Sequence, residues 1–348
     1  MFSFRTTPVA DQPDKALQKG RVGVFATQSS WDAASGRYLA DIFRQRGNLA
    51  ASFAPEEDSP HIFFDPDALK DLDAIVVEIQ EVGCRYFPYT IDVLRLMSTL
   101  KTLDPSPALY IVDHPNPAGR DVEGTLPAGT ADEWTPSVVH RHGLTLGELS
   151  QLYADEIGAR YPLHIISAEI ADTARTLMPW TIPPARDFPG VFTPFFYTGG
   201  SLWTETNVSP GIGTPRPYEY IGAPFIKNTI DDLPLPEGLL ARPCDFTPSV
   251  GPYQGQKCFG WQFILTPGAR YHSLLHAVRL MRYVAEHFSQ FHISDSLYTR
   301  LADPVMTEYL KGDLTFDIVD EHVKSEEQRW IRKARRYLLY DDQPVRIK

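Results

Sequence analysis

Short apolar runs alternate with amphipathic segments through the first half of the chain. The runs suit buried strands and cover residues 21–27, 49–53, 73–79 and 108–112. Three other segments, residues 32–46, 90–103 and 145–157, repeat apolar side chains at helical spacing. The last of them opens with a capping-box pattern of Thr145 and Glu148. Apolar strands that alternate with helices predict a parallel sheet covered on both faces.

The texture changes from about residue 178 to 248, where proline, glycine and aromatic residues crowd together. Such an irregular stretch is typical of a functional surface or a domain junction. Beyond it we expect a strand at 261–265, a helix at 273–288, and a strand fragment with a charged helix within 315–339. The pattern predicts an α/β fold with a parallel-sheet domain over residues 1–217 and a smaller α+β domain over 218–348.

Composition excludes several classes of protein. With 348 residues, 43% of them hydrophobic and 22% charged, the chain has material for two ordinary globular domains. A net charge of −11 repels nucleic acid and anionic membrane, so neither is an expected partner. No N-terminal stretch resembles a signal peptide or membrane helix, which predicts a cytoplasmic protein. The three cysteines lack metal-ligand spacing and are expected to be free thiols.

Familiar cofactor and nucleophile motifs are missing from the sequence. The first predicted strand is followed by no G-x-G-x-x-G, and the chain contains no P-loop and no G-x-S-x-G elbow. Residues 211–214 (GIGT) are too short for a phosphate loop and predict a turn. We therefore expect no cofactor and no metal, and the sequence does not address the oligomeric state.

Polar clusters follow three of the apolar runs, where an open parallel sheet binds its ligands. Two further groups stand before the capped helix and in the glycine-rich junction. The candidates are Glu56, Glu57, Glu78, Gln80, Glu81, Asp113, Asn116, His142, Glu205 and Asn207. Carboxylates, amides and nearby aromatic residues such as Tyr89 suit glycosidic chemistry, in which one carboxylic acid protonates the leaving oxygen.

A structural role remains the alternative for each of these residues. Glu56 is also interpretable as a solvated loop acid, and Glu78 as the partner of an arginine. Glu81 suits a structural cap and His142 a structural histidine, and Asp113 and Asn116 suit turns around proline. The aromatic residues, Tyr86, Tyr89 and Trp203, fit a core as well as a sugar platform.

Eight segments stand in the same order as in the NamZ (YbbC-like) family, which this chain resembles from about Arg21 to Phe225. They are RVGVFATQS, FAPEE, DAIVVEIQEVGCRYFPYT, YIVDHPNP, VEG, RHGLTLGEL, GGSLWTETNVSPGIGT and IGAPF. The resemblance implies a Rossmann-like domain, a smaller C-terminal domain and a cleft between them. It also implies an exo-β-N-acetylmuramidase that releases N-acetylmuramic acid from the non-reducing end of peptidoglycan fragments. Glu56 then corresponds to the family's catalytic glutamate.

The chain also departs from the family pattern. Glu57 and Asp58 replace a His-Gly pair, and His114 and Ile212 stand where the family has arginines. A guanidinium suits the lactyl carboxylate of muramic acid, and several arginines remain as substitutes: Arg85, Arg120, Arg141, Arg186 and Arg216. These losses leave two alternatives, which are a catalytically degenerate sugar-binding protein and a hydrolase of another acidic or amino sugar.

Overall fold

The four predicted apolar runs and one further strand form a five-stranded parallel sheet in a computed structural model that describes residues 10, 12–32, 35–54, 61–128, 136–167, 182–227 and 232–347. The strand order is β4 (Leu49–Phe53), β1 (Val22–Ala26), β5 (Ala74–Glu78), β6 (Ala108–Val112) and β8 (Leu163–Ile166). Four consecutive residues are buried in each of β1, β5 and β6, because helices cover both faces of the sheet. The predicted α/β class is confirmed.

The two faces of the sheet pack against different helices, as period-two alternation requires. Phe25, Ile75 and Val77 face a cluster built with α3 (Pro66–Lys70), α4 (Pro88–Lys101) and α5 (Leu146–Ile157). Val24 and Val76 point the other way, toward α1 (Lys15–Lys19) and α2 (Leu39–Arg46). The helix predicted over 32–46 begins only at residue 39, since β2 (Trp31–Asp32) and β3 (Arg37–Tyr38) form a short hairpin before it.

The strand order reverses between β1 and β5. The chain passes from β1 outward to β4 and then returns across β1 to β5, so the strands on either side of β1 are reached in opposite directions. Ligands of open α/β sheets bind outside the carboxyl ends of the strands at such a reversal. We call this region, formed by the residues that follow β1, β5 and β6, the carboxyl edge.

A second unit contains an antiparallel sheet in the order β10 (Leu239–Phe246), β11 (Cys258–Leu265) and β9 (Tyr220–Ala223). Its helices are α6 (Thr193–Gly200), α7 (Ser273–His287), α8 (Asp295–Leu301) and α9 (Pro304–Lys311), with the 3-10 helix η3 (Ser201–Glu205) after α6. Side chains of α6 share one core cluster with β9, β11 and α7, so α6 belongs to this unit although it precedes residue 218. The helix lies very close to α7, because a Cβ on Gly199 would overlap the Ser273 carbonyl oxygen.

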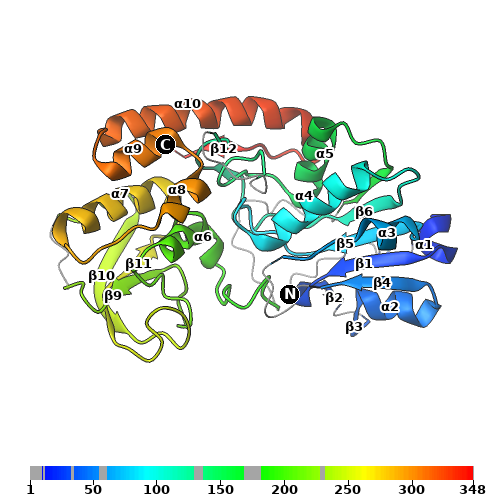
Figure 1. Cartoon of the computed structure of the whole chain (residues 1–348), viewed down its shortest axis with the longest axis horizontal. Coiled ribbons are helices and arrows are strands. Elements are labelled where there is room, and N and C mark those ends of the chain that lie inside the picture. The colour runs from blue at the N-terminus through cyan, green and yellow to red at the C-terminus, as the bar shows by residue number, and fades with distance from the viewer. Residues whose placement is uncertain are drawn as a thin grey trace.

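The C-terminal segment connects the two units (Figure 1). Helix α10 (Phe316–Ala334) starts against the second unit through Val319 and Val323 and ends in the core of the first through Trp330 and Ala334. After the 3-10 helix η4 (Arg335–Tyr337), β12 (Val345–Arg346) pairs with β7 (Asp121–Val122) of the first unit. The strand fragment predicted within 315–339 was wrong, because α10 and η4 occupy most of that range and the structure has no strand there.

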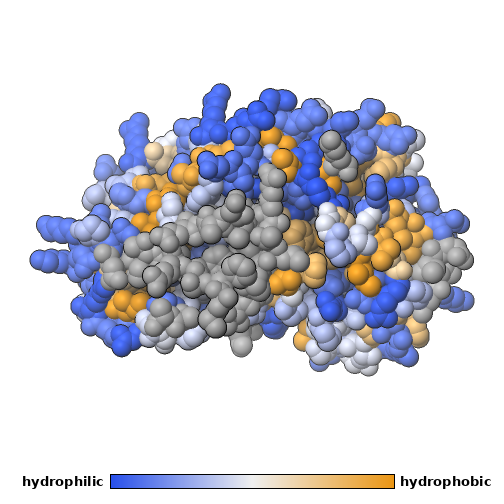
Figure 2. All heavy atoms as spheres, turned by 180° about the vertical axis from the view of Figure 1, so that it is seen from behind, coloured by the Kyte–Doolittle hydropathy of each residue, from blue (hydrophilic) through white to orange (hydrophobic). Residues whose placement is uncertain are grey.

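Hydrophilic residues cover most of the described surface on the face seen in Figure 2, and hydrophobic residues gather there in separate patches. Among the described residues, no helix combines the length and the apolar character needed to cross a bilayer.

Candidate active site

Polar groups from three strand ends meet at the carboxyl edge. Glu78 is the last residue of β5, its side chain is 14% exposed, and its Oε1 lies 3.6 Å from Nε2 of His114, which follows β6. The backbone N–H of Gln80 donates to Oγ of Ser29 (3.1 Å), just beyond β1, in the 3-10 helix η2 (Gln28–Ser30). Nε2 of Gln80 donates to the carbonyl oxygen of Pro115 (3.1 Å). We call Ser29, Glu78, Gln80, His114 and Pro115 the sheet-edge group.

Glu81 and His142 form a buried pair beneath this group. The Leu144 N–H donates to Nδ1 of His142 (3.1 Å), so the ring proton sits on Nε2 and is donated to Oε1 of Glu81 (3.1 Å). The same oxygen accepts the backbone N–H groups of Gly83 (2.5 Å) and Cys84 (3.2 Å). Oε2 of Glu81 is buried without a hydrogen-bond partner among the described residues. The pair holds the turn after β5 in place.

Asp113 lies deeper still and is fully buried. It accepts hydrogen bonds from the Gly147 N–H (2.7 Å), the Thr145 hydroxyl (2.7 Å) and the Tyr340 hydroxyl (2.8 Å). Burial raises the pKa of this carboxyl group, while the three donors oppose that effect. Asp113 therefore connects the end of β6, the start of α5 and the C-terminal segment.

Asn116 is also buried, and both ends of its amide are bound. It donates to the Leu144 carbonyl oxygen (2.9 Å) and accepts from the Ala118 N–H (2.9 Å). The backbone of Gly83 passes so close, with φ +83°, that a Cβ there would lie 2.7 Å from the Asn116 amide. We call Glu81, Asp113, Asn116 and His142 the support layer, because they bind the loops that carry the sheet-edge group.

Glu205 and Asn207 organise the second unit. Glu205 accepts from Oγ of Ser296 (2.6 Å) and Nη1 of Arg300 (2.8 Å). Burial opposes the charged form, but these two donors outweigh it and lower the pKa of Glu205. Asn207 binds the backbone of Gln290 and His292, each at 2.7 Å. No hydrogen bond or ion pair within the described ranges joins Glu205 or Asn207 to the sheet-edge group.

Aromatic side chains pack where the two units meet. Phe188 contacts Phe87, at the start of α4, with ring centroids 5.6 Å apart, and it contacts Tyr197 of α6 at 4.8 Å. Tyr89 lies against the same Phe87 ring at 4.9 Å and is partly buried. Upstream, the Gln28 amide donates to the Pro183 carbonyl oxygen (2.8 Å). The segment 183–188 therefore spans the carboxyl edge from the end of β1 to the start of α4.

Two further residues lie at this junction. Tyr218 was not singled out in the sequence, and Arg186 was one of five arginines left open. Tyr218 has a backbone φ of 66°, which is unusual for a bulky residue and is often found at functional sites. Its hydroxyl forms no hydrogen bond with any described residue. Arg186 has a side chain that is 80% exposed, with Asp187 as its recorded ion partner at 3.5 Å. Neither the backbone angle nor the exposure leaves a signature in the sequence.

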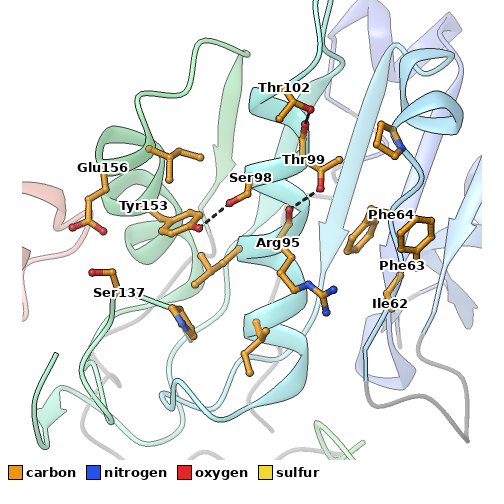
Figure 3. A pocket seen from close by; sticks show the side chains of 15 residues that line it. Ile62, Phe63, Phe64, Arg95, Ser98, Thr99, Thr102, Ser137, Tyr153 and Glu156 are labelled. Atoms are coloured by element: carbon orange, nitrogen blue, oxygen red, sulfur yellow. Dashed lines mark hydrogen bonds between the residues drawn. The ribbon is translucent and has the colours of Figure 1, made fainter. Parts of the chain in front are cut away.

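A pocket of about 870 Å³ lies beside α4, and none of the described residues predicted for the site lines it (Figure 3). Its walls carry hydroxyl groups and aromatic rings, and Tyr153 points to Ser98 with their oxygens 2.8 Å apart. Among the described residues of its lining, the one carboxylate is that of Glu156, which is paired with Lys333. These described residues therefore do not supply the two acids that glycosidic cleavage uses, whereas the carboxyl edge lies at the strand-order reversal where open sheets bind ligands.

Glu56 and Glu57 lie within residues 55–60, outside the described residues. In the part of the chain that the structure describes, no three His, Cys, Asp or Glu side chains gather as a metal site requires. Cys84, Cys244 and Cys258 are buried free thiols, as the sequence predicted.

Comparison with known proteins supplies the remaining evidence. The family model described as "Exo-beta-N-acetylmuramidase NamZ, N-terminal" matches residues 63–184, and its C-terminal counterpart matches residues 195–340. The peptidoglycan beta-N-acetylmuramidase NamZ of Bacillus subtilis (strain 168) is 27% identical over 291 residues, which are 79% of this chain and 69% of that protein.

Two solved structures share the fold. Both are DUF1343 family proteins of Bacteroides fragilis NCTC 9343. One has a TM-score of 0.79 at 20% identity and covers 94% of this chain and 96% of its own. The other has a TM-score of 0.73 at 21% identity and covers 94% and 95%. These likenesses support the two-part α/β architecture.

Proposed function

The chain belongs to the exo-β-N-acetylmuramidase NamZ family, and from this premise we propose that it releases N-acetylmuramic acid from the non-reducing end of peptidoglycan fragments. The observation that carries the proposal is the match of both family domains, over residues 63–184 and 195–340. The meeting of Glu78, Gln80 and His114 at the strand-order reversal supports it independently.

We assign the chemistry to two acids that follow or end strands on either side of β1. Glu56, which follows β4 in the sequence, would donate a proton to the leaving glycosidic oxygen. Glu78 would face the anomeric carbon, where a negative charge stabilises the positive charge that develops in the transition state. Its partial exposure and its neighbour His114 suit a carboxylate that must reach a ligand without being fully solvated.

The other predicted residues would hold or contact the sugar. Gln80 has an amide at the carboxyl edge, and Tyr89 lies beside the aromatic junction. The support layer would fix the loops that carry Glu78 and Gln80, since positioning errors near 1 Å reduce turnover strongly. Glu205 and Asn207 would shape the wall contributed by the second unit.

Hydrolysis of para-nitrophenyl N-acetyl-β-muraminide tests the assignment. We expect turnover by the wild type and a fall in kcat of about 100-fold or more in Glu56→Gln and in Glu78→Gln. Glu57→Gln and Glu156→Gln are matched controls, one adjacent to the proposed acid and one in the pocket beside α4, and both should keep most of the activity.

Three outcomes would count against the proposal. Normal turnover by Glu56→Gln would remove the proposed acid. Binding of N-acetylmuramic acid without turnover by the wild type would favour a degenerate sugar-binding protein. Faster cleavage of another glycoside in a chromogenic panel would identify a different sugar.

A further inference from the structure

The proposed substrate brings a negative charge into an acidic protein. N-acetylmuramic acid carries a lactyl carboxylate, and the chain has a net charge of −11, with Glu56 and Glu78 assigned to the chemistry. A carboxylate bound near these acids requires a cation, and a guanidinium is the best geometric match. The sequence left five arginines open, and the structure distinguishes among them.

Three of the five arginines are buried and already hold partners inside the protein. Arg85 donates to the backbone oxygens of Thr125 (2.9 Å) and Leu301 (2.6 Å). Arg120 pairs with Glu148 and Asp342, and Arg141 pairs with Glu123 (2.7 Å). Each of these three residues is at most 4% exposed, so none can reach a ligand without leaving its partners unpaired.

Arg216 is exposed but compensates a buried acid. Its Nη1 lies 3.4 Å from Oε2 of Glu219, a residue that is only 5% exposed. Drawing Arg216 away would leave this carboxylate without its counter-charge inside the second unit.

Arg186 is exposed and compensates no buried acid among the described residues. Its ion contact is with the adjacent Asp187 at 3.5 Å, and the side chain is 80% exposed. Its segment is anchored on one side by the Gln28–Pro183 hydrogen bond and on the other by Phe188 against Phe87. These anchors place the Arg186 segment across the carboxyl edge, between the end of β1 and the start of α4.

A second donor lies beside Arg186. The ring of Tyr218 packs on Phe188 (6.2 Å) and Tyr197 (5.0 Å), and its hydroxyl has no hydrogen-bond partner among the described residues. Phe188 follows Arg186 by two residues, so its contact with Tyr218 brings the Arg186 segment and the Tyr218 ring together. Burial raises the pKa of this phenol and Asp187 raises it further, while Arg300 and Arg186 oppose that effect. Tyr218 therefore remains a neutral hydroxyl donor at physiological pH.

We propose that Arg186 binds the lactyl carboxylate of the muramic acid unit and that the Tyr218 hydroxyl donates a further hydrogen bond to it. This inference rests on the proposed function, since it names the group that the site recognises. It makes Arg186 a specificity residue that separates N-acetylmuramic acid from N-acetylglucosamine, the same sugar without the lactyl group.

The test compares the para-nitrophenyl β-glycosides of these two sugars as substrates of the full chain. We expect Arg186→Ala to raise KM for the muraminide about 10- to 100-fold with little change in kcat, and to leave the glucosaminide unaffected. Arg186→Lys should recover part of the loss, and Tyr218→Phe should raise KM about 3- to 10-fold. Arg216→Ala, which changes another exposed arginine, should leave the preference intact.

Titration calorimetry with the two free sugars separates this inference from the proposed function. If the wild type binds N-acetylmuramic acid more tightly and Arg186→Ala removes that preference, the carboxylate site stands even when no glycoside is hydrolysed. If Arg186→Ala retains the wild-type preference in binding or in KM, the site is overturned while the hydrolase proposal survives. Circular dichroism of each variant confirms that the fold is unchanged.

Discussion

The hydrogen bond between Tyr340 and Asp113 offers a direct measure of how the C-terminal segment stabilises the support layer. We consider Tyr340→Phe, which removes one hydroxyl and keeps the ring. The hydroxyl is 2.8 Å from Oδ2 of Asp113, and the carboxylate is fully buried. A hydrogen bond to a charged group contributes about 1.5–3 kcal/mol, so the free energy of unfolding should fall by about that amount at pH 7.

The loss of stability in Tyr340→Phe should depend on pH. Burial raises the pKa of Asp113, so the folded protein binds a proton at a pH where the unfolded chain, with its ordinary value near 3.8, does not. Stability from this group therefore declines as pH rises through that window. Tyr340→Phe loses a donor to Asp113, which raises the pKa of Asp113 in the folded protein further. The free energy of unfolding of the variant therefore falls more with rising pH than that of the wild type. The deficit of Tyr340→Phe should be complete at neutral pH and shrink in acid toward the 0.5–1.5 kcal/mol or so of a neutral hydrogen bond.

Urea unfolding at neutral and acidic pH measures both effects. Tyr337→Phe is the matched control on the same segment, because the Tyr337 hydroxyl binds Asp155 at the surface and should contribute less than about 0.5 kcal/mol. An equal loss in the two variants, or a Tyr340→Phe deficit that does not change with pH, would refute the reasoning.

Three further predictions concern other buried contacts. Trp330→Phe leaves the His142 carbonyl oxygen without its indole donor (2.9 Å) and should cost about 1–3 kcal/mol in thermal unfolding; an unchanged melting temperature would contradict this. Arg120→Met leaves the buried Glu148 and the partly buried Asp342 without their cation and should cost about 3–5 kcal/mol, whereas Arg186→Met should stay within about 0.5 kcal/mol of the wild type. Glu205→Gln should cost about 1 kcal/mol at pH 7. Because the pKa of Glu205 is lowered in the fold, its stabilisation is present above the ordinary value and lost as pH falls through the folded value, so the two proteins should converge in acid; divergence there would argue against the Arg300 pair.

The central strands β1, β5 and β6 could be predicted because each is apolar over several consecutive residues, whereas the half-exposed edge strand β8 was missed. The capping box of α5 was also predicted from the sequence, and the structure confirms it with both of its hydrogen bonds. Helix α6 was missed because its sequence, TPFFYTGG, has poor helix formers and is held by tertiary packing against α7. Local patterns contain no record of such contacts.

In the candidate site, too, local sequence predicts some residues, and tertiary contacts determine the position of others. Glu78 and Gln80 were predictable because the rule for strand ends depends only on where an apolar run stops. Arg186 could not be chosen from five arginines, because its position depends on the Gln28–Pro183 contact between residues far apart in the sequence. In the sequence, His114 was noted only as the residue that replaces a family arginine. The structure shows that its imidazole lies beside Glu78.

The bridging course of α10 has a consequence for biosynthesis. Residues 12–167 leave the ribosome long before Trp330, Tyr340 and Val345, which supply an indole to His142, a hydroxyl to Asp113 and a strand partner to β7. During translation the first unit therefore lacks these three contacts until the end of the chain has been made. Completion of the loops that follow β5 and β6 becomes one of the final events of synthesis. Premature termination near residue 320 should yield a protein whose second unit is nearly complete but whose first unit lacks its last supports.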